Sequence, residues 1–168
     1  MPKARIAVVF GSDSDWPVME GCIAQLRAFG EAPYVELMSA HRCPQRVHEF
    51  ASGAAADGFE VIIAAAGLSA ALAGAIAAQS CVPVIGVPLA NGPLQGVDSL
   101  LSTVQMPPGI PVACVGIGEA GARNAALLAI RILATHDQKL AAAYRGFQAE
   151  QAKSIQAKNE SLMDRFAR

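Results

Sequence analysis

The sequence predicts a three-layer α/β/α domain built on a five-stranded parallel sheet. Short, almost entirely apolar segments alternate along the chain with longer segments of helical character, which is the pattern of an α/β protein. The apolar segments are continuous rather than alternating, as expected for strands that are covered on both faces. At 168 residues the chain is long enough for one such domain, which buries roughly 70% of its unfolded surface.

In the first half of the chain, strands and helices are separated by recognisable end signals. Gly30 and Gly58 follow the two helical segments and are typical of helix C-termini. Pro44 suits a first helical turn because it lacks the N–H group that would be unpaired there. The predicted elements are a strand at 5–10, a helix at 15–29, a strand at 34–38, a helix at 44–57 and a strand at 60–65.

The second half continues the alternation and adds a terminal helix. The predicted elements are a helix at 72–80, strands at 83–88 and 111–117, and helices at 97–104, 122–136 and 138–166. The last helix carries many charges and lacks a continuous apolar stripe near its end. We therefore expect one domain over 1–168, with a core at about 5–137 and residues 138–168 packing on a neighbouring subunit.

The segment Val61–Val97 contains no Asp, Glu, Lys, Arg or His. A membrane span is not the favoured interpretation, because glycine, serine, glutamine and proline interrupt the segment and alanine dominates it. A helix without a polar side must be buried. Because an outer-layer helix at 72–80 cannot hide both faces within its own subunit, the sequence predicts an obligate homo-oligomer.

Composition excludes several classes of partner and compartment. The 13 basic and 14 acidic residues give a net charge of -1, and no basic stripe indicates a nucleic-acid surface. The four cysteines are scattered without metal-ligand spacing, as in a cytoplasmic protein with reduced thiols. The chain starts with Met-Pro-Lys-Ala-Arg and leads directly into a strand, so no signal peptide is expected.

For a chain this short we expect the flavodoxin-like strand order 2-1-3-4-5 with right-handed crossovers. Such sheets bind ligands beyond the carboxyl ends of their strands. The loops that should converge there are Gly11–Asp15, Ser39–Arg42, Ala66–Ala70 and Leu89–Gly96.

The loop Gly11–Asp15 combines a glycine with two serines and two aspartates directly before a helix. Unpaired N–H groups at a helix N-terminus suit a phosphate, and Asp15 suits ribose hydroxyls. The alternative is an ordinary capping turn, with Asp13 or Ser14 as the N-cap. The loop is neither a Walker motif nor a Gly-x-Gly-x-x-Gly fingerprint, so it does not indicate a nucleoside triphosphate or a dinucleotide.

The second polar loop, Ser39-Ala40-His41-Arg42, places an imidazole beside a guanidinium at a strand end. Histidine carries protons near neutral pH, and arginine binds phosphate or carboxylate through two bonds. His41 is the candidate acid or base and Arg42 the candidate anion ligand. The alternative is a solvated surface loop. His48 and His136 are expected to have structural roles.

Several segments together resemble one enzyme family, and the similarity spans roughly residues 6–137. They are Gly11–Trp16, Ser39–Arg42, Gly96–Ser102, Val104–Val112 and Ala120–Ala129. The family is that of 5-(carboxyamino)imidazole ribonucleotide mutase and its sister, aminoimidazole ribonucleotide carboxylase, both of purine biosynthesis.

The resemblance implies a mutase that moves carboxylate from the exocyclic nitrogen of an imidazole ribonucleotide to ring carbon four. It implies no metal and no cofactor, and an octamer of identical subunits. His41 would move the protons, while Ser12, Asp15 and Arg42 would bind the ribonucleotide. The residues that would line the same pocket are Gly11, Ser39, Gly67 and Ser69.

The chain departs from the mutase pattern at Ala66–Gly74, which reads Ala-Gly-Leu-Ser-Ala-Ala-Leu-Ala-Gly. Ala71 stands where mutases usually carry histidine, and Ala73 stands where they carry proline. Ser69 matches the carboxylase pattern instead. Ala90-Asn91-Gly92-Pro93 also differs, because mutases have Gln-Ser and small residues there. The mutase is favoured because arginine follows His41, and a carboxylase that uses carbon dioxide directly is the alternative.

A non-catalytic flavodoxin-like module that binds flavin or a regulatory nucleotide is a second alternative. Flavin sites of this type surround the ring with aromatic side chains, and the candidate loops supply only Trp16. A purely structural oligomer would leave His41 and Arg42 without a task.

Overall fold

The computed structural model describes residues 4–166 and has the predicted sheet, with five parallel strands in the order β2-β1-β3-β4-β5. The strands are β1 Ile6–Phe10, β2 Tyr34–Leu37, β3 Val61–Gly67, β4 Val84–Leu89 and β5 Ala113–Cys114. The helices are the 3-10 turn η1 Asp13–Asp15, α1 Trp16–Ala28, α2 Pro44–Gly53, α3 Leu72–Ala77, α4 Val97–Val104, α5 Gly118–Leu133 and α6 Gln138–Phe166.

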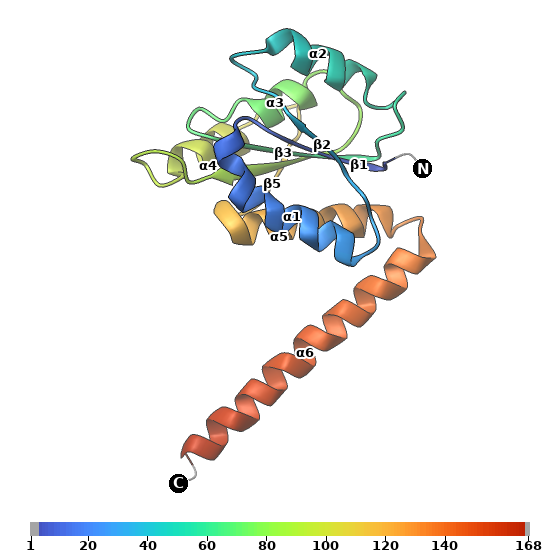
Figure 1. Cartoon of the computed structure of the whole chain (residues 1–168), viewed down its shortest axis with the longest axis vertical. Coiled ribbons are helices and arrows are strands. Elements are labelled where there is room, and N and C mark those ends of the chain that lie inside the picture. Colours follow the sequence, from blue (N-terminus) through green and yellow to red (C-terminus); the bar gives the residue numbers. More distant parts are fainter. Residues whose placement is uncertain (1–3, 167–168) are drawn as a thin grey trace.

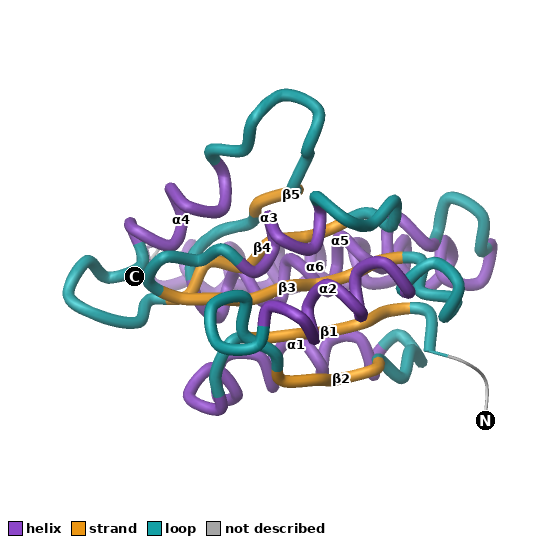
Figure 2. The backbone as a smooth tube through the Cα atoms, turned by 90° about the horizontal axis from the view of Figure 1, so that it is seen from above, coloured by secondary structure: helices purple, strands orange, loops and turns teal. Residues whose placement is uncertain are grey.

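Helices cover both faces of the sheet (Figures 1 and 2). Successive side chains of a strand point to opposite faces, so Val8 of β1 packs toward α1 and α5, while Val9 packs toward α2 and α3. All five residues of β1 are buried. This explains why the strands read as continuous apolar runs, and it leaves polar side chains only where the strands end.

Several element boundaries differ from the sequence prediction. Helix α2 ends at Gly53 rather than at 57, α3 ends at Ala77 rather than at 80, and α5 ends at Leu133 rather than at 136. Strand β5 is only two residues long, against the predicted 111–117, and it pairs with Ile85 and Gly86 of β4 alone. It lies at the sheet edge, where Pro111 has no N–H group to extend a ladder. Helix α5 begins at Gly118, four residues earlier than predicted, because glycine does not prevent a helix whose later turns are buried.

The terminal helix α6 is continuous over the predicted residues and extends away from the body of the molecule (Figure 1). Its first turns are attached, since Leu140 is buried and Tyr144 stacks on Phe29. Further along, Ile155 and Met163 are exposed apolar side chains. Within residues 4–166, none of the helices combines the length and the apolar character needed to cross a lipid bilayer.

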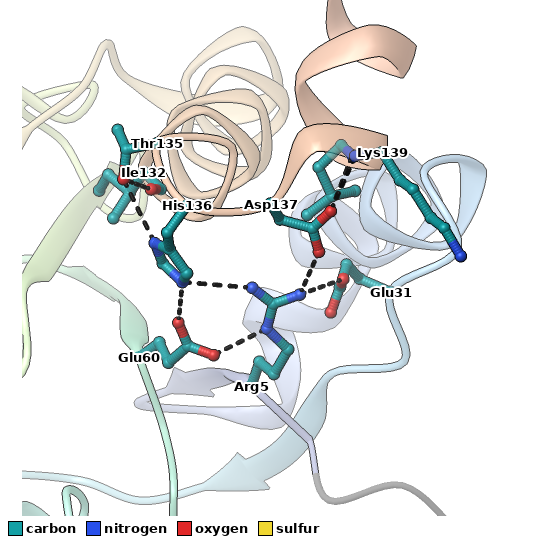
Figure 3. Close-up of polar contacts among 9 residues, drawn as sticks. Arg5, Glu31, Glu60, Ile132, Thr135, His136, Asp137 and Lys139 are labelled. Carbon is teal, nitrogen blue, oxygen red and sulfur yellow. Dashed lines mark hydrogen bonds and ion pairs between the residues drawn. The ribbon is translucent and has the colours of Figure 1, made fainter.

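A charged cluster joins the α5–α6 connection to the start of the sheet (Figure 3). The Arg5 guanidinium donates to Glu60 at 2.7 Å and to Asp137 at 2.9 Å, and it lies 3.5 Å from Glu31. His136 lies 2.6 Å from the second oxygen of Glu60. The cluster fixes the point at which α6 leaves the domain, and it gives His136 the structural role expected from the sequence.

Candidate active site

A cavity of about 820 Å³ opens at the carboxyl ends of β1, β2, β3 and β4. The loops after these four strands form its wall, as the predicted topology requires. All eight site residues predicted from the sequence line this one cavity: Gly11, Ser12, Asp15, Ser39, His41, Arg42, Gly67 and Ser69. The structure therefore brings together side chains from three separate segments of the chain.

The first loop forms a capped turn that fixes its backbone. The Ser12 side chain accepts a hydrogen bond from the Ser14 N–H, and Asp15 accepts one from the Ser12 N–H, which together form a capping box around η1. The N-cap is Ser12, so the alternative with Asp13 or Ser14 at that position is wrong. Because Ser12 both caps the turn and lines the cavity, the capping and binding interpretations of this loop are compatible.

Asp15 is the buried carboxylate of the site, with 2% of its surface exposed. Its Oδ2 accepts from the Ser12 N–H at 2.9 Å, and its Oδ1 accepts from the Asn91 side-chain amide at 2.7 Å. Burial raises the pKa of Asp15, while these hydrogen bonds and the nearby Arg42 charge oppose that rise.

The loop after β2 brings a cation and an imidazole to the cavity. Met38 is buried and anchors the strand end, and the Cys43 N–H donates to the Ser39 carbonyl to close the loop. The Arg42 guanidinium donates to the Gly11 carbonyl, which holds it against the first loop. His41 is exposed and lines the same cavity.

The loop after β3 carries unusual backbone geometry. Leu68 has φ +55°, a left-handed conformation that is rare for a residue with a branched side chain, and it is 52% exposed. Its side chain extends across the cavity rim to Gly92, where an added Cβ would lie 2.6 Å from a Leu68 methyl group. No side chain caps α3, so Ser69 is left to line the cavity.

Sequence reasoning missed Asn91 and Leu68 as parts of the site. Both line the cavity, and both belong to loops that were expected at this edge. The sequence feature that could have identified Asn91 is its position, because it is a polar residue that closely follows the apolar run of β4. In the sequence alone it stands out only as a departure from the mutase pattern.

The chemical content of the cavity is a guanidinium, a buried carboxylate, an imidazole and several hydroxyl groups beside a capped turn. The guanidinium suits a phosphate, the serine hydroxyls of the turn are further hydrogen-bonding groups, and a fixed carboxylate suits sugar hydroxyls. The imidazole adds a proton carrier. This combination fits a small phosphorylated sugar derivative that undergoes proton transfer.

Comparison with known proteins agrees with this chemistry. A family model described as AIR carboxylase matches residues 5–154. The chain belongs to the AIR carboxylase family. One family member, the N5-carboxyaminoimidazole ribonucleotide mutase of Escherichia coli (strain K12), is 53% identical over 137 residues, covering 82% of this chain and 81% of the relative. The mutase of Mycobacterium tuberculosis (strain ATCC 25618 / H37Rv) is 49% identical over 160 residues, covering 95% and 91%.

Two solved structures are similar to this chain in fold. The crystal structure of Treponema denticola PurE superposes with a TM-score of 0.82 at 28% identity, covering 94% of this chain and 97% of that one. A single-site variant of Treponema denticola PurE2 gives the same TM-score and identity. The predicted fold class and the family resemblance are both confirmed.

Proposed function

We propose that this chain is an N5-carboxyaminoimidazole ribonucleotide mutase, an isomerase of purine biosynthesis that transfers carboxylate from the exocyclic nitrogen to ring C4. Curated mutases about half identical over most of the chain support this activity. The observation that carries it is the meeting of His41 and Arg42 with the Ser12–Asp15 turn around one cavity. The product is 4-carboxy-5-aminoimidazole ribonucleotide.

In this proposal the ribonucleotide is held at its phosphate and its sugar. Arg42 and the first loop, Gly11 and Ser12, bind the phosphate, because the guanidinium lies against this loop, where it donates to the Gly11 carbonyl. Asp15 accepts hydrogen bonds from the ribose hydroxyls. Ser39, Gly67 and Ser69 line the same cavity.

His41 transfers a proton twice, first as an acid and then as a base. As the carbamate N–C bond breaks, carbon dioxide leaves and protonated His41 gives its proton to the exocyclic nitrogen. Ring C4 then attacks the carbon dioxide, the new C–C bond forms, and the now neutral His41 removes the C4 proton. The imidazole ends in its starting form, as a group that acts first as an acid and then as a base must.

The cavity contributes by keeping carbon dioxide beside its acceptor. A molecule held next to its reaction partner reacts as if at a very high effective concentration, and exclusion of water protects the labile carbamate. Leu68, Ala71 and Leu72 give the cavity an apolar wall on the α3 side, and Ser69 is the polar side chain available there. This is the region where the chain departs from the mutase pattern.

We infer that the working form is a cytoplasmic homo-oligomer, with an octamer as the expected stoichiometry. The support is α3, in which Ala75 and Ala77 are half-buried apolar residues, followed by the exposed Ala78. An uncharged helix that is left partly open in one chain is suited to burial against another chain.

A carboxylase that adds free carbon dioxide to aminoimidazole ribonucleotide is the second candidate, because Ser69, Ala71 and Leu72 follow the carboxylase pattern. One experiment separates the two. Purified protein is given either the carbamate ribonucleotide or aminoimidazole ribonucleotide with bicarbonate. The mutase assignment predicts rapid turnover of the carbamate, and rapid turnover only with bicarbonate would replace it with the carboxylase. Tight flavin binding without turnover of either substrate would favour the non-catalytic module.

A further inference from the structure

Asn91, in the loop after β4, makes the one side-chain to side-chain hydrogen bond that Asp15 forms within the described residues. Its amide nitrogen lies 2.7 Å from Asp15 Oδ1, across 76 positions of sequence. The opposite carboxylate oxygen is taken by the Ser12 N–H at 2.9 Å. Two donors on two different oxygens fix both the position and the plane of the carboxylate.

The Asn91 side chain packs against Gly67, the last residue of β3. A Cβ added to Gly67 would lie 2.7 Å from the Asn91 Cβ and 2.8 Å from its amide nitrogen. Those distances leave no room for a side chain at residue 67, so Asn91 packs directly on the glycine backbone. The amide is therefore confined between the Gly67 backbone and the Asp15 carboxylate.

We propose that Asn91 is a positioning residue of this site, whose amide holds the Asp15 carboxylate in the orientation that receives the ribose hydroxyls. The inference rests on the proposed ribonucleotide substrate. It also gives Gly67 a role, since this glycine provides the space in which the amide lies. A hydrogen bond to a buried charge is among the stronger ones in proteins, so its loss should weaken ribonucleotide binding measurably.

Two replacements of similar size separate positioning from simple packing. Asn91→Leu removes the donor, so Asp15 is protonated more readily, and binding should weaken about 10- to 100-fold. Asn91→Asp places two carboxylates together, which must share a proton before one can donate to the other. Its binding should therefore recover as the pH falls.

The readout is the affinity for 4-carboxy-5-aminoimidazole ribonucleotide, measured by calorimetry from about pH 8 to about pH 5.5. Relative to the wild type, Asn91→Asp should improve on acidification and Asn91→Leu should worsen. His41 and Arg42 are the other charged or titratable side chains that line the cavity within the described residues, and Asp13 lies on the same turn as Asp15. All three are common to every variant, so their titration cancels in the ratio of the variant's affinity to that of the wild type at the same pH. If this ratio does not change with pH for either Asn91→Asp or Asn91→Leu, the proposal is overturned.

Two further variants and a substrate-free measurement sharpen the test. Gly67→Ala should displace the amide and behave like Asn91→Leu. Pro93 lies in the same exposed loop outside the cavity, so Pro93→Ala should bind like the wild type.

The pKa of Asp15, followed by carbon-13 NMR in the unliganded protein, should be higher in Asn91→Leu than in the wild type. This measurement needs no substrate, so an unchanged pKa refutes the Asn91 proposal, whereas a wild type that does not bind the ribonucleotide refutes the proposed function instead.

Discussion

The charged and titratable side chains of the cavity differ in how they are held. Asp15 is buried and bonded at both oxygens, whereas His41 and Arg42 are exposed on a loop. A buried, doubly bonded carboxylate does not reorganise when the ligand arrives, which lowers the cost of recognising the sugar. The exposed imidazole of His41 can move to contact a reacting atom. This difference fits a binding role for Asp15 and a proton-transfer role for His41.

The Arg42 guanidinium is predicted to act in binding more than in chemistry. Arg42→Ala should raise KM about 10- to 100-fold, because it removes a charged hydrogen-bond donor to the phosphate, and it should change kcat less. Steady-state kinetics with the carbamate ribonucleotide measure both values. Arg46→Ala is the matched control, since Arg46 pairs with Glu36 outside the cavity. A fall in kcat with an unchanged KM would contradict the role given to Arg42.

At this scale the sequence predicted which residues line the cavity wherever a polar group interrupted an apolar run. His41, Arg42, Ser12 and Asp15 stood out because nothing in the core explains them, and their roles in the site stay predictions. Asn91 could not be identified in the same way. Its proposed role depends on the closeness of two loops that are far apart in sequence, and on the packing of its side chain against Gly67, which has no side chain of its own. Neither feature can be seen in the sequence alone.

The existence and order of the elements were predictable from the buried strands, whereas several helix ends and the length of β5 were not. Strand β5 forms only two pairs at the sheet edge. The start of α5 was missed because Gly118 and Gly121 lie within its first turn, and glycine is unfavourable in helices. Gly121 explains the local geometry: a Cβ there would lie 1.6 Å from the Gly116 carbonyl oxygen. The loop and the first turn of α5 are thus packed backbone against backbone.

Two glycine replacements in helices should have opposite effects on stability. Gly121→Ala should lower the free energy of unfolding by about 2 kcal/mol or more, because the loop must move to admit a methyl group. Gly146→Ala, on the open surface of α6, should raise the free energy of unfolding by about 0.5–1 kcal/mol, because alanine favours helix. Denaturant unfolding of both variants measures this. Equal effects of the same sign would show that the close contact at Gly121 is misassigned.

On the scale of the whole molecule, the Arg5 cluster ties the start of β1 to the α5–α6 turn. Burial alone would raise the pKa of Glu60, but hydrogen bonds from Arg5 and His136 outweigh it and lower that pKa. The hydrogen bond from Arg5 also lowers the pKa of Asp137. A lowered pKa stabilises the fold above the unfolded-state value, which is about 4 for these groups. That contribution disappears as the pH falls through the folded-state pKa.

Arg5→Met should therefore cost stability at neutral pH and cost less in acid. We expect the difference in Tm between the wild type and the variant to shrink as the pH is lowered from about 7 to about 3. Thermal unfolding followed by circular dichroism at several pH values gives this difference. If the difference in Tm stays constant or widens in acid, the lowered pKa values of Glu60 and Asp137 do not depend on Arg5.

Subunit association is predicted to depend on α3. Ala75→Glu places a charge on an uncharged, half-buried helix, and burying an unpaired charge at an interface is costly. The assembly should dissociate to smaller species in sedimentation velocity, while Ala55→Glu, at an exposed position after α2, should leave it intact. An unchanged assembly in the α3 variant would remove this helix from the interface.

The most direct test of the account replaces the proton carrier and measures binding and turnover together. In His41→Asn the ribonucleotide should still bind with nearly wild-type affinity, because Arg42, Ser12 and Asp15 are unchanged. Turnover of the carbamate ribonucleotide should fall by at least about 100-fold, the contribution expected of a general acid and base. Wild-type turnover in this variant would contradict the central claim that loops from separate strands meet to place His41 at the reacting carbon.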